Sequence, residues 1–290
     1  MNINKEKFIL VIIGGLLFLN FFAWIVVYDL NGSDFLEVNF FDVGQGDAVF
    51  IQTPQRHQIL IDGGPGSIVL EKLAKEMPFW DRTIDLIILS HPENDHLSGL
   101  TDVLKRYKVE NILWTGIARD TPAFKEWQRL IKEEGAEIKI AQAGQRIILP
   151  TNKEKAGIDI LYPLEKLEGK EMENSNDVSI VVRLIFGEKS FLFTGDVGKA
   201  TEKKLLEKEI NVKSNVLKVG HHGSKTSSSD DFIKKVLPEI AIIEVGKDNS
   251  YGHPHQETLA TLGKYGISIF RTDKNKDIKI LCDSQSLKLK

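Results

Sequence analysis

The sequence contains a single cysteine, Cys282, and has little excess of either charge. One cysteine excludes an intramolecular disulfide and any zinc site built on cysteine pairs, so a bound metal would depend on histidine and carboxylate ligands. The formal net charge is -3 over 290 residues, which gives no global indication of nucleic-acid binding. The sequence has no internal repeat, no low-complexity segment and no second stretch apolar enough to span a membrane.

Residues 8–28 form an almost unbroken apolar run. At about 1.5 Å per residue, this run makes a helix of roughly 30 Å, the thickness of a bilayer core. A cleaved signal peptide is the alternative, but its apolar region would be shorter, about 7–15 residues, and would precede a small-x-small cleavage site. No such site follows the run. We therefore expect residues 8–28 to be a retained single-pass transmembrane anchor.

The charges that flank this run indicate its orientation. Lys5 and Lys7 precede it, whereas the residues just after it carry only acidic charges. The positive-inside rule then places residues 1–7 in the cytoplasm and the large domain outside it. Residues 29–34 form a short linker, and residues 35–290 form the extracytoplasmic domain.

The domain at residues 35–290 is predicted to be an α/β (α+β) structure. Segments 35–43, 48–52 and 57–62 read as strands with short turns between them, which favours an antiparallel meander. Further along the chain, predicted strands alternate with amphipathic helices. We expect one domain of two sheets with helices packed on the outside.

A cluster of titratable side chains follows the apolar run Ile84 to Leu89. The cluster contains His91, Glu93, Asp95 and His96. The run itself is typical of a buried strand, and open α/β sheets place their chemistry where strands end. A solvated turn would also be rich in polar residues, but it would not require two histidines and two carboxylates together.

Two further strands end in metal-binding residue types. Asp196 follows the predicted strand 190–194, and His221 and His222 follow the predicted strand 215–219. Imidazole and carboxylate ligands suit zinc, manganese or iron. The pattern therefore predicts one or two divalent metal ions, and two adjacent ions would favour a hydrolytic reaction.

These motifs resemble the metallo-β-lactamase superfamily. The segment from His91 to His96 is similar to its His-x-His-x-Asp-His signature. Other segments are similar to the C-terminal hydrolase domain of ComEC-type competence proteins, namely Gly44 to Ala48, Ile61 to Gly64, Thr194 to Asp196, Gly220 to Ser224 and Tyr251 to Pro254. The resemblance runs from about Phe35 to the C-terminus and implies an αββα sandwich that binds Mn or Zn.

The resemblance also implies a ligand set. Asp95, His96 and His221 would form one metal site, Asp196 would bridge, and His91 and Glu93 would belong to the other site. The superfamily has histidine where this chain has Glu93, although an acidic residue at this position fits the competence branch.

Chemistry suggests further roles around these ligands. Asp95 could also act as the catalytic base, and His222 and His253 are catalytic candidates, although a structural loop role is an equal alternative for His253. The residues expected to bind substrate are Ser224, Lys225, Asn249 and Tyr251. The residues expected to support the ligands are Asp62, Asp47 and Asp177. Five lysines are candidates for lining a substrate groove, although a solvated surface position is the favoured alternative for each one singly: Lys199, Lys203, Lys218, Lys225 and Lys247.

Three functions fit these expectations. The leading hypothesis is a membrane-anchored phosphodiesterase or nuclease acting on DNA in a role similar to competence, with an uptake channel as a possible protein partner. The second is a hydrolase of a small amide, thioester or lactone. The third is a module that binds DNA or a protein partner without catalysis. A fold alone does not select among them.

Overall fold

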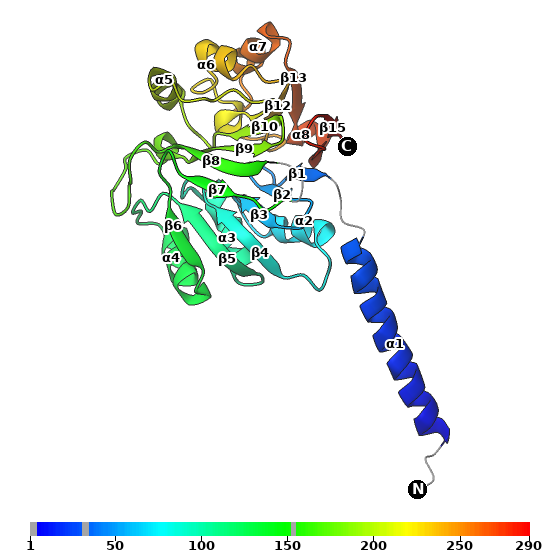
Figure 1. Cartoon of the computed structure of the whole chain (residues 1–290). Helices are drawn as coiled ribbons and strands as arrows, with labels where there is room; N and C mark the ends of the chain where they lie inside the picture. The colour runs from blue at the N-terminus through cyan, green and yellow to red at the C-terminus, as the bar shows by residue number, and fades with distance from the viewer. Residues whose placement is uncertain (1–4, 31–34, 152–154) are drawn as a thin grey trace.

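Two β-sheets lie face to face and form the centre of the fold (Figure 1). The computed structural model describes residues 5–30, 35–151 and 155–290. One sheet has eight strands in the order β15-β14-β1-β2-β3-β4-β5-β6, and the other has seven in the order β13-β12-β11-β10-β9-β8-β7. The predicted two-sheet α/β architecture is confirmed.

The eight-stranded sheet contains the predicted meander. Its strands are β1 (Leu36–Phe40), β2 (Val49–Gln52), β3 (Gln58–Ile61), β4 (Thr83–Ile88), β5 (Lys108–Trp114), β6 (Glu137–Ile140), β14 (Ile278–Cys282) and β15 (Leu287–Leu289). Strands β1, β2 and β3 pair antiparallel, as the alternating pattern predicted. Strands β3 to β6 pair parallel.

The seven-stranded sheet carries the second half of the site. Its strands are β7 (Arg146–Ile148), β8 (Ala156–Tyr162), β9 (Val181–Phe186), β10 (Lys189–Phe193), β11 (Val216–Lys218), β12 (Ile240–Ile243) and β13 (Ser268–Arg271). Strands β10 to β13 are parallel to one another. Their carboxyl ends therefore meet along one edge, which positions the side chains that follow them.

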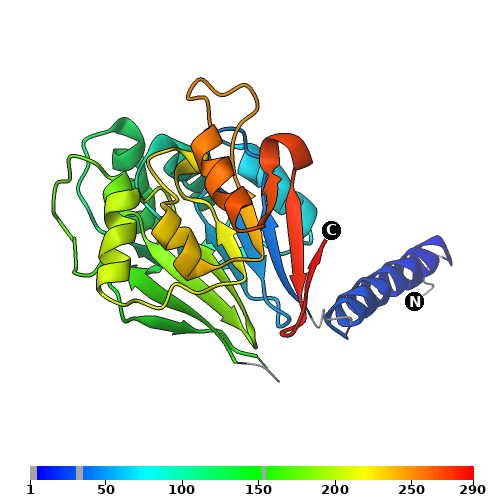
Figure 2. The ribbon, with the colours of Figure 1, turned by 90° about the horizontal axis from the view of Figure 1, so that it is seen from above.

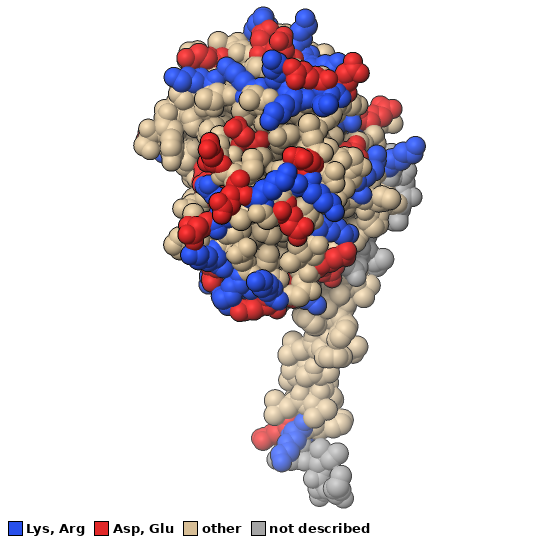
Figure 3. Space-filling model, turned by 90° about the vertical axis from the view of Figure 1, so that its left-hand side faces the viewer, with Lys and Arg blue, Asp and Glu red and all other residues tan. Residues whose placement is uncertain are grey.

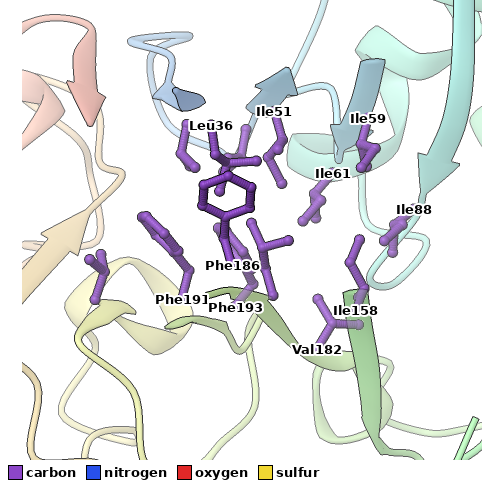
Figure 4. Packing of buried hydrophobic residues seen from close by; sticks show 14 of the residues in the cluster. Leu36, Ile51, Ile59, Ile61, Ile88, Ile158, Val182, Phe186, Phe191 and Phe193 are labelled. Atoms are coloured by element: carbon purple, nitrogen blue, oxygen red, sulfur yellow. The ribbon is translucent and has the colours of Figure 1, made fainter. Parts of the chain in front are cut away.

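The main core lies between the sheets (Figure 4). Leu36, Ile51 and Ile61 from the first sheet face Val182 and Phe193 from the second. Strands with helices on their other face are buried on both sides, so they read as apolar runs instead of strict alternation. This is why the stretch before His91 is almost entirely Ile and Leu.

Helices cover the outer face of each sheet (Figure 2). The first sheet is covered by α2 (Ile68–Glu76), α3 (Asn94–Leu104) and α4 (Pro122–Glu134), and the second by α5 (Lys199–Glu207), α6 (Asp230–Val236) and α7 (Gln256–Lys264). The remaining short elements are α8 (Thr272–Asn275), η1 (Asn176–Val178) and η2 (Gly220–Gly223). The arrangement is an αββα sandwich.

Helix α4 illustrates how the sequence specifies these outer layers. The Thr121 side chain accepts a hydrogen bond from the Phe124 amide and caps the helix, and Gly135 ends it in a left-handed conformation. Phe124, Trp127 and Ile131 recur at helical spacing and are buried against the sheet.

Helix α1 (Lys5–Leu30) extends away from the sandwich (Figure 1). Its segment Lys5–Val27 has a mean hydropathy of 2.6 and is long and apolar enough to cross a membrane. The helix begins three residues before the predicted span of 8–28. Residues 1–4 and 31–34, within the predicted N-terminal segment and linker, lie outside the described residues. The boundaries proposed for these segments, and the orientation, stay predictions.

Candidate metal centre

The candidate ligands come together where four elements meet. His91 follows β4, and Asp95 and His96 lie in the first turn of α3. Asp196 follows β10, and η2 after β11 carries His221 and His222. Both sheets end on the same side, so residues that are far apart in the sequence converge there.

Four side chains form a compact set of ligand atoms: Asp95, His96, Asp196 and His222. His222 Nε2 lies 3.2 Å from Asp95 Oδ2 and 3.5 Å from Asp196 Oδ2. His96 Nε2 lies 3.5 Å from Asp196 Oδ2. Ligands about 2.0–2.1 Å from a tetrahedral ion lie about 3.3 Å apart, so these side chains fit a single divalent ion.

Unpartnered buried atoms also favour a cation at this position. Among the described residues, His91 Nε2 and His96 Nε2 are buried without a hydrogen-bond partner, at 4.0 and 3.5 Å from Asp196 Oδ2. Buried polar atoms without partners are costly, and a cation among them would satisfy the imidazole nitrogens and the carboxylate together.

The structure places His222, and not His221, within this four-residue set. His221 Nε2 is 3.9 Å from Asp196 Oδ2, and its side chain is 30% exposed, whereas that of His222 is 2% exposed. Both residues have left-handed backbone conformations, with φ of 48° and 51°. Such strain in non-glycine residues concentrates at functional sites. The turn directs the second histidine inward, into the four-residue set, whereas His221, the predicted ligand, lines the cavity beside it.

His91 and Glu93 differ in their surroundings. His91 is fully buried, with Nε2 4.0 Å from Asp196 Oδ2. Glu93 Oε1 instead accepts hydrogen bonds from Arg119 and from the Ser175 hydroxyl. Glu93 therefore neutralises a guanidinium, and it lies outside the four-residue set.

Asp62 orients His96 from behind. Its Oδ2 lies 2.9 Å from His96 Nδ1, and the carboxylate also accepts hydrogen bonds from the Ser90 amide and hydroxyl. The contact fixes Nε2 toward the cluster, as carboxylates commonly do for metal-binding histidines. Gly46 packs so closely that a Cβ there would clash with the Asp95 backbone oxygen. Glycine at 46 thus permits the loop after β1 to contact α3.

A buried ionic network lies beneath the cluster. Lys218 Nζ donates to Asp47 and lies 3.8 Å from Asp196 Oδ1. Asp47 Oδ1 is 3.2 Å from His222 Nδ1, and Glu244 accepts from the Ala48 amide. Lys218 is buried, so the prediction that it lines an open groove is wrong: a lysine inside an apolar strand has an internal partner.

The surrounding charges set the protonation states of the cluster. Burial alone would raise the pKa values of Asp95 and Asp196, but the facing histidines lower both. Burial would lower the pKa of His222, but Asp196 and Asp47 raise it to about 10. The metal-free chain therefore holds protons on imidazoles that must lose them to bind an ion.

A cavity of about 210 Å³ opens onto the cluster. Its lining residues are Gln45, Glu93, Asp95, Asn176, Asp196, His221, His222, Tyr251 and His253. Burial and then the charges of His222 and His221 lower the pKa of His253 to about 4, so this ring is neutral near pH 7. His253, a catalytic candidate in the sequence analysis, therefore lines the cavity as a neutral ring.

The other predicted substrate-binding residues have varied positions. The Ser224 hydroxyl is buried and pairs with Thr226. The Asn249 side chain is bonded to the backbone of its own loop. Lys225 is exposed, and Tyr251 lines the cavity. Asp177 lines a separate cavity of about 740 Å³.

Sequence reasoning missed four residues of this region: Arg119, Ser175, Glu244 and the internal role of Lys218. Arg119 and Ser175 lie in loops, and no local pattern connects them with Glu93. Glu244 directly follows β12. Like the other site residues, it follows the carboxyl end of a strand. A search for titratable residues at strand ends would have identified it.

The αββα sandwich and a histidine–carboxylate site at the strand ends together define a class of metal-dependent hydrolases. Residues 41–246 match the family described as the Metallo-beta-lactamase superfamily. The chain belongs to this superfamily, whose fold binds divalent metals.

The relatives of this chain include competence proteins. It is 32% identical over 260 residues to ComE operon protein 3 of Bacillus subtilis (strain 168), covering 84% of this chain and 32% of that protein. It is 32% identical over 238 residues to competence protein ComA of Neisseria gonorrhoeae, covering 81% and 31%. The chain thus spans about a third of the length of these relatives, and the predicted resemblance is confirmed.

A solved structure is similar in fold alone. The metallo-beta-lactamase fold protein YhfI from Bacillus subtilis has a TM-score of 0.55 and 13% identity, covering 84% of this chain and 99% of that chain. Similarity at this level of identity supports the architecture, and the substrate must be argued from the site.

Proposed function

We propose that this protein is a metal-dependent phosphodiesterase that cleaves DNA at a membrane surface. The observation that carries the proposal is the four-residue cluster of Asp95, His96, Asp196 and His222 at the floor of an open cavity. The names of the competence relatives suggest DNA as the substrate.

The cluster would hold one ion, either zinc or manganese. Bound there, a divalent ion would supply Lewis-acid stabilisation of negative charge and would activate water for attack on phosphorus. His222 would act as a ligand. Asp62 orients His96 through its Nδ1, and the Glu244 main-chain oxygen, 2.9 Å from Nδ1 of His222, orients His222. Asp95 contributes a carboxylate that faces the cavity.

His221 is the residue best placed to move a proton. It lines the cavity beside the cluster, and its Nε2 lies 3.5 Å from the Asn176 amide nitrogen. Burial, outweighing the opposing charge of Asp196, lowers its pKa, so the ring is largely neutral and can accept a proton. The sequence analysis had His221 as a metal ligand and His222 as a catalytic candidate.

The contact between Glu93 and Arg119 favours one ion over two. Glu93 lines the cavity and is engaged by Arg119 and Ser175, so we assign it to positioning the Arg119 guanidinium. Arginine suits phosphate because its planar fork presents several donors to the oxygens. A second ion could be bound by His91, but binding by Glu93 would require the ion to displace Arg119 from its carboxylate.

Helix α1 gives the protein its proposed location. A single-pass anchor with a cytoplasmic N-terminus would hold the sandwich outside the cytoplasm, next to the membrane. The test is protease protection in intact cells. Cleavage of the sandwich by external protease supports this orientation, and protection of the sandwich in intact cells with cleavage after lysis contradicts it.

The activity test uses the full chain in detergent with added Mn²⁺ or Zn²⁺. We expect cleavage of end-labelled DNA, with loss of cleavage in Asp95→Asn. Failure to cleave single- or double-stranded DNA while holding metal would refute the nuclease assignment. Rapid hydrolysis of a β-lactam, thioester or lactone by the same metal-loaded chain would favour the small-substrate hydrolase. DNA binding without turnover would favour a binding module.

A further inference from the structure

Tyr251 presents an exposed aromatic ring at the rim of the cavity. The residue is 65% exposed. Its ring stacks on His253 with a centroid separation of 5.6 Å and an interplanar angle of 21°. Both rings line the cavity that reaches Asp95 and His222. One face of the tyrosine ring thus packs on His253, and most of the residue's surface is open to solvent.

The loop that carries Tyr251 is held in place by hydrogen bonds. The Asn249 amide donates to the backbone oxygens of Gly246 and His253 at 3.0 and 2.7 Å, and its oxygen accepts from the His253 amide at 3.0 Å. These bonds close the loop on both sides of the ring. Asn249, predicted to bind substrate, instead orders the residues that surround Tyr251.

The same loop is attached to the turn that carries His222. The His255 amide donates to the Gly223 carbonyl at 3.0 Å. Pro254 packs so closely on Gly223 that a Cβ there would clash with it. The loop that carries Tyr251 is therefore tied to the turn of the cluster before any ligand binds, and preorganisation of this kind lowers the entropic cost of binding.

The volume of the cavity limits what it can enclose. Pockets that enclose whole small ligands have volumes of about 300–1,000 Å³, and this one has about 210 Å³. It accommodates a reacting phosphate, but the groups on either side of that phosphate must lie outside. The rim offers an aromatic face at Tyr251 for one of them.

The charge of the chain provides little general attraction for the phosphates of a nucleic acid. Basic and acidic side chains are interspersed on the face shown in Figure 3, and the net charge of the chain is -3. A protein of this kind gains less from general attraction to phosphates than a basic one does. Stacking on an aromatic ring adds an attraction that does not depend on charge, and it tolerates any base because every base has a π-face.

We propose that Tyr251 is a stacking platform for an unpaired base next to the scissile phosphate, so that the preferred substrate is single-stranded nucleic acid. The proposal rests on the proposed phosphodiesterase function. A base inside a duplex is already stacked between its neighbours and cannot lie on the ring without leaving the helix. Stacking of one base corresponds to about 5- to 150-fold in affinity.

The test compares oligonucleotides with and without a base at the positions that flank the cleaved phosphate. For the full chain in detergent, we expect an abasic residue there to raise KM by about 5- to 150-fold. Tyr251→Ala should remove this preference for the intact strand, and Tyr251→Phe should keep it. Phe79→Ala, which removes another exposed aromatic ring far along the chain, is the matched control and should also keep it.

A second readout reports stacking without turnover. The fluorescence of 2-aminopurine in a single strand should be quenched on binding to the wild-type chain without added metal, and Tyr251→Ala should abolish the quenching. Equal KM values for intact and abasic strands, or for single strands and blunt duplex, would overturn the proposal while leaving the nuclease function intact. If no nucleic acid is cleaved, the proposed function fails, and the absence of quenching would then overturn the stacking as well.

Discussion

His222 Nε2 lies 3.2 Å from Asp95 Oδ2, although 127 positions separate the two residues in the sequence. The contact joins the turn after β11 to the first turn of α3, and so connects the two sheets across the candidate site. Asp196 and His96 complete the set within the same few ångströms. This contact underlies the assignment of the ligands.

Replacing either histidine of the turn should separate their roles. His222→Ala should weaken binding of Zn²⁺ or Mn²⁺ by more than about 100-fold, because loss of a supporting residue alone commonly costs 10–100-fold. His221→Ala should retain the ion and lose turnover. Isothermal titration of the full chain measures both affinities. Loss of the ion in His221→Ala, with retention in His222→Ala, would restore the assignment made from sequence.

Position 93 should control how many ions are bound. Wild type and Glu93→Gln should each hold one ion per chain, because Glu93 is engaged by Arg119 and Ser175. Glu93→His combined with Arg119→Ala should add an imidazole beside His91 and raise the content toward two. Elemental analysis after gel filtration gives the ratio. Two ions in the wild-type chain, falling to one in Glu93→Gln, would show that Glu93 is a ligand.

Lys218 should be important for stability. Lys218→Met removes the cation that faces buried Asp47, and breaking a buried pair in this way costs about 3–5 kcal/mol. Lys279→Met is the matched control, since Lys279 is a quarter exposed and pairs with Glu37 and Glu76 near the surface, where an ion pair contributes about 0–1 kcal/mol. Urea unfolding of the metal-free chain measures both. Equal decreases in the free energy of unfolding of the two variants would contradict a stabilising role for the Lys218–Asp47 pair.

Cys282 should report folding through its reactivity. Burial raises the pKa of this thiol from 9.0 to about 11. Because the folded chain favours the protonated form, this contribution to stability is complete below about pH 9 and is lost as the pH rises through 11. At pH 8 the folded chain should react with a thiol reagent far more slowly than the chain in guanidinium, and rapid labelling of the native chain would refute the buried state.

This labelling also serves as a check on the other variants. The sequence has a single cysteine, so the signal has one source. A site variant that stays protected at Cys282 is folded, and its loss of metal or turnover can then be attributed to the site itself.

Local sequence pattern predicted much of the architecture. The alternation in β1 to β3 gave the meander, and the apolar run before His91 gave a strand that ends at the site. Such signals are readable because burial on one or both faces of a sheet determines which residues can occupy each position.

The parts that could not be predicted depend on tertiary contacts. His221 and His222 are adjacent and chemically identical, and only the left-handed turn determines which one points inward. Glu93 matches a ligand position, but its partners come from loops 26 and 82 positions away. Lys218 resembled a surface lysine until the structure placed Asp47 beside it. The periodicity of apolar residues does not predict contacts between side chains that are far apart in the sequence.

The most direct test of the central claim is the cleavage of end-labelled single-stranded DNA by the metal-loaded full chain, compared with His222→Ala under the same conditions and with Cys282 protection as the fold check. We expect cleavage by the wild-type chain and a decrease of more than about 100-fold in the variant, since removing a residue that merely supports a ligand already costs about 10–100-fold. A folded His222→Ala chain that cleaves as fast as wild type, or a metal-loaded wild-type chain that leaves DNA intact, would contradict it.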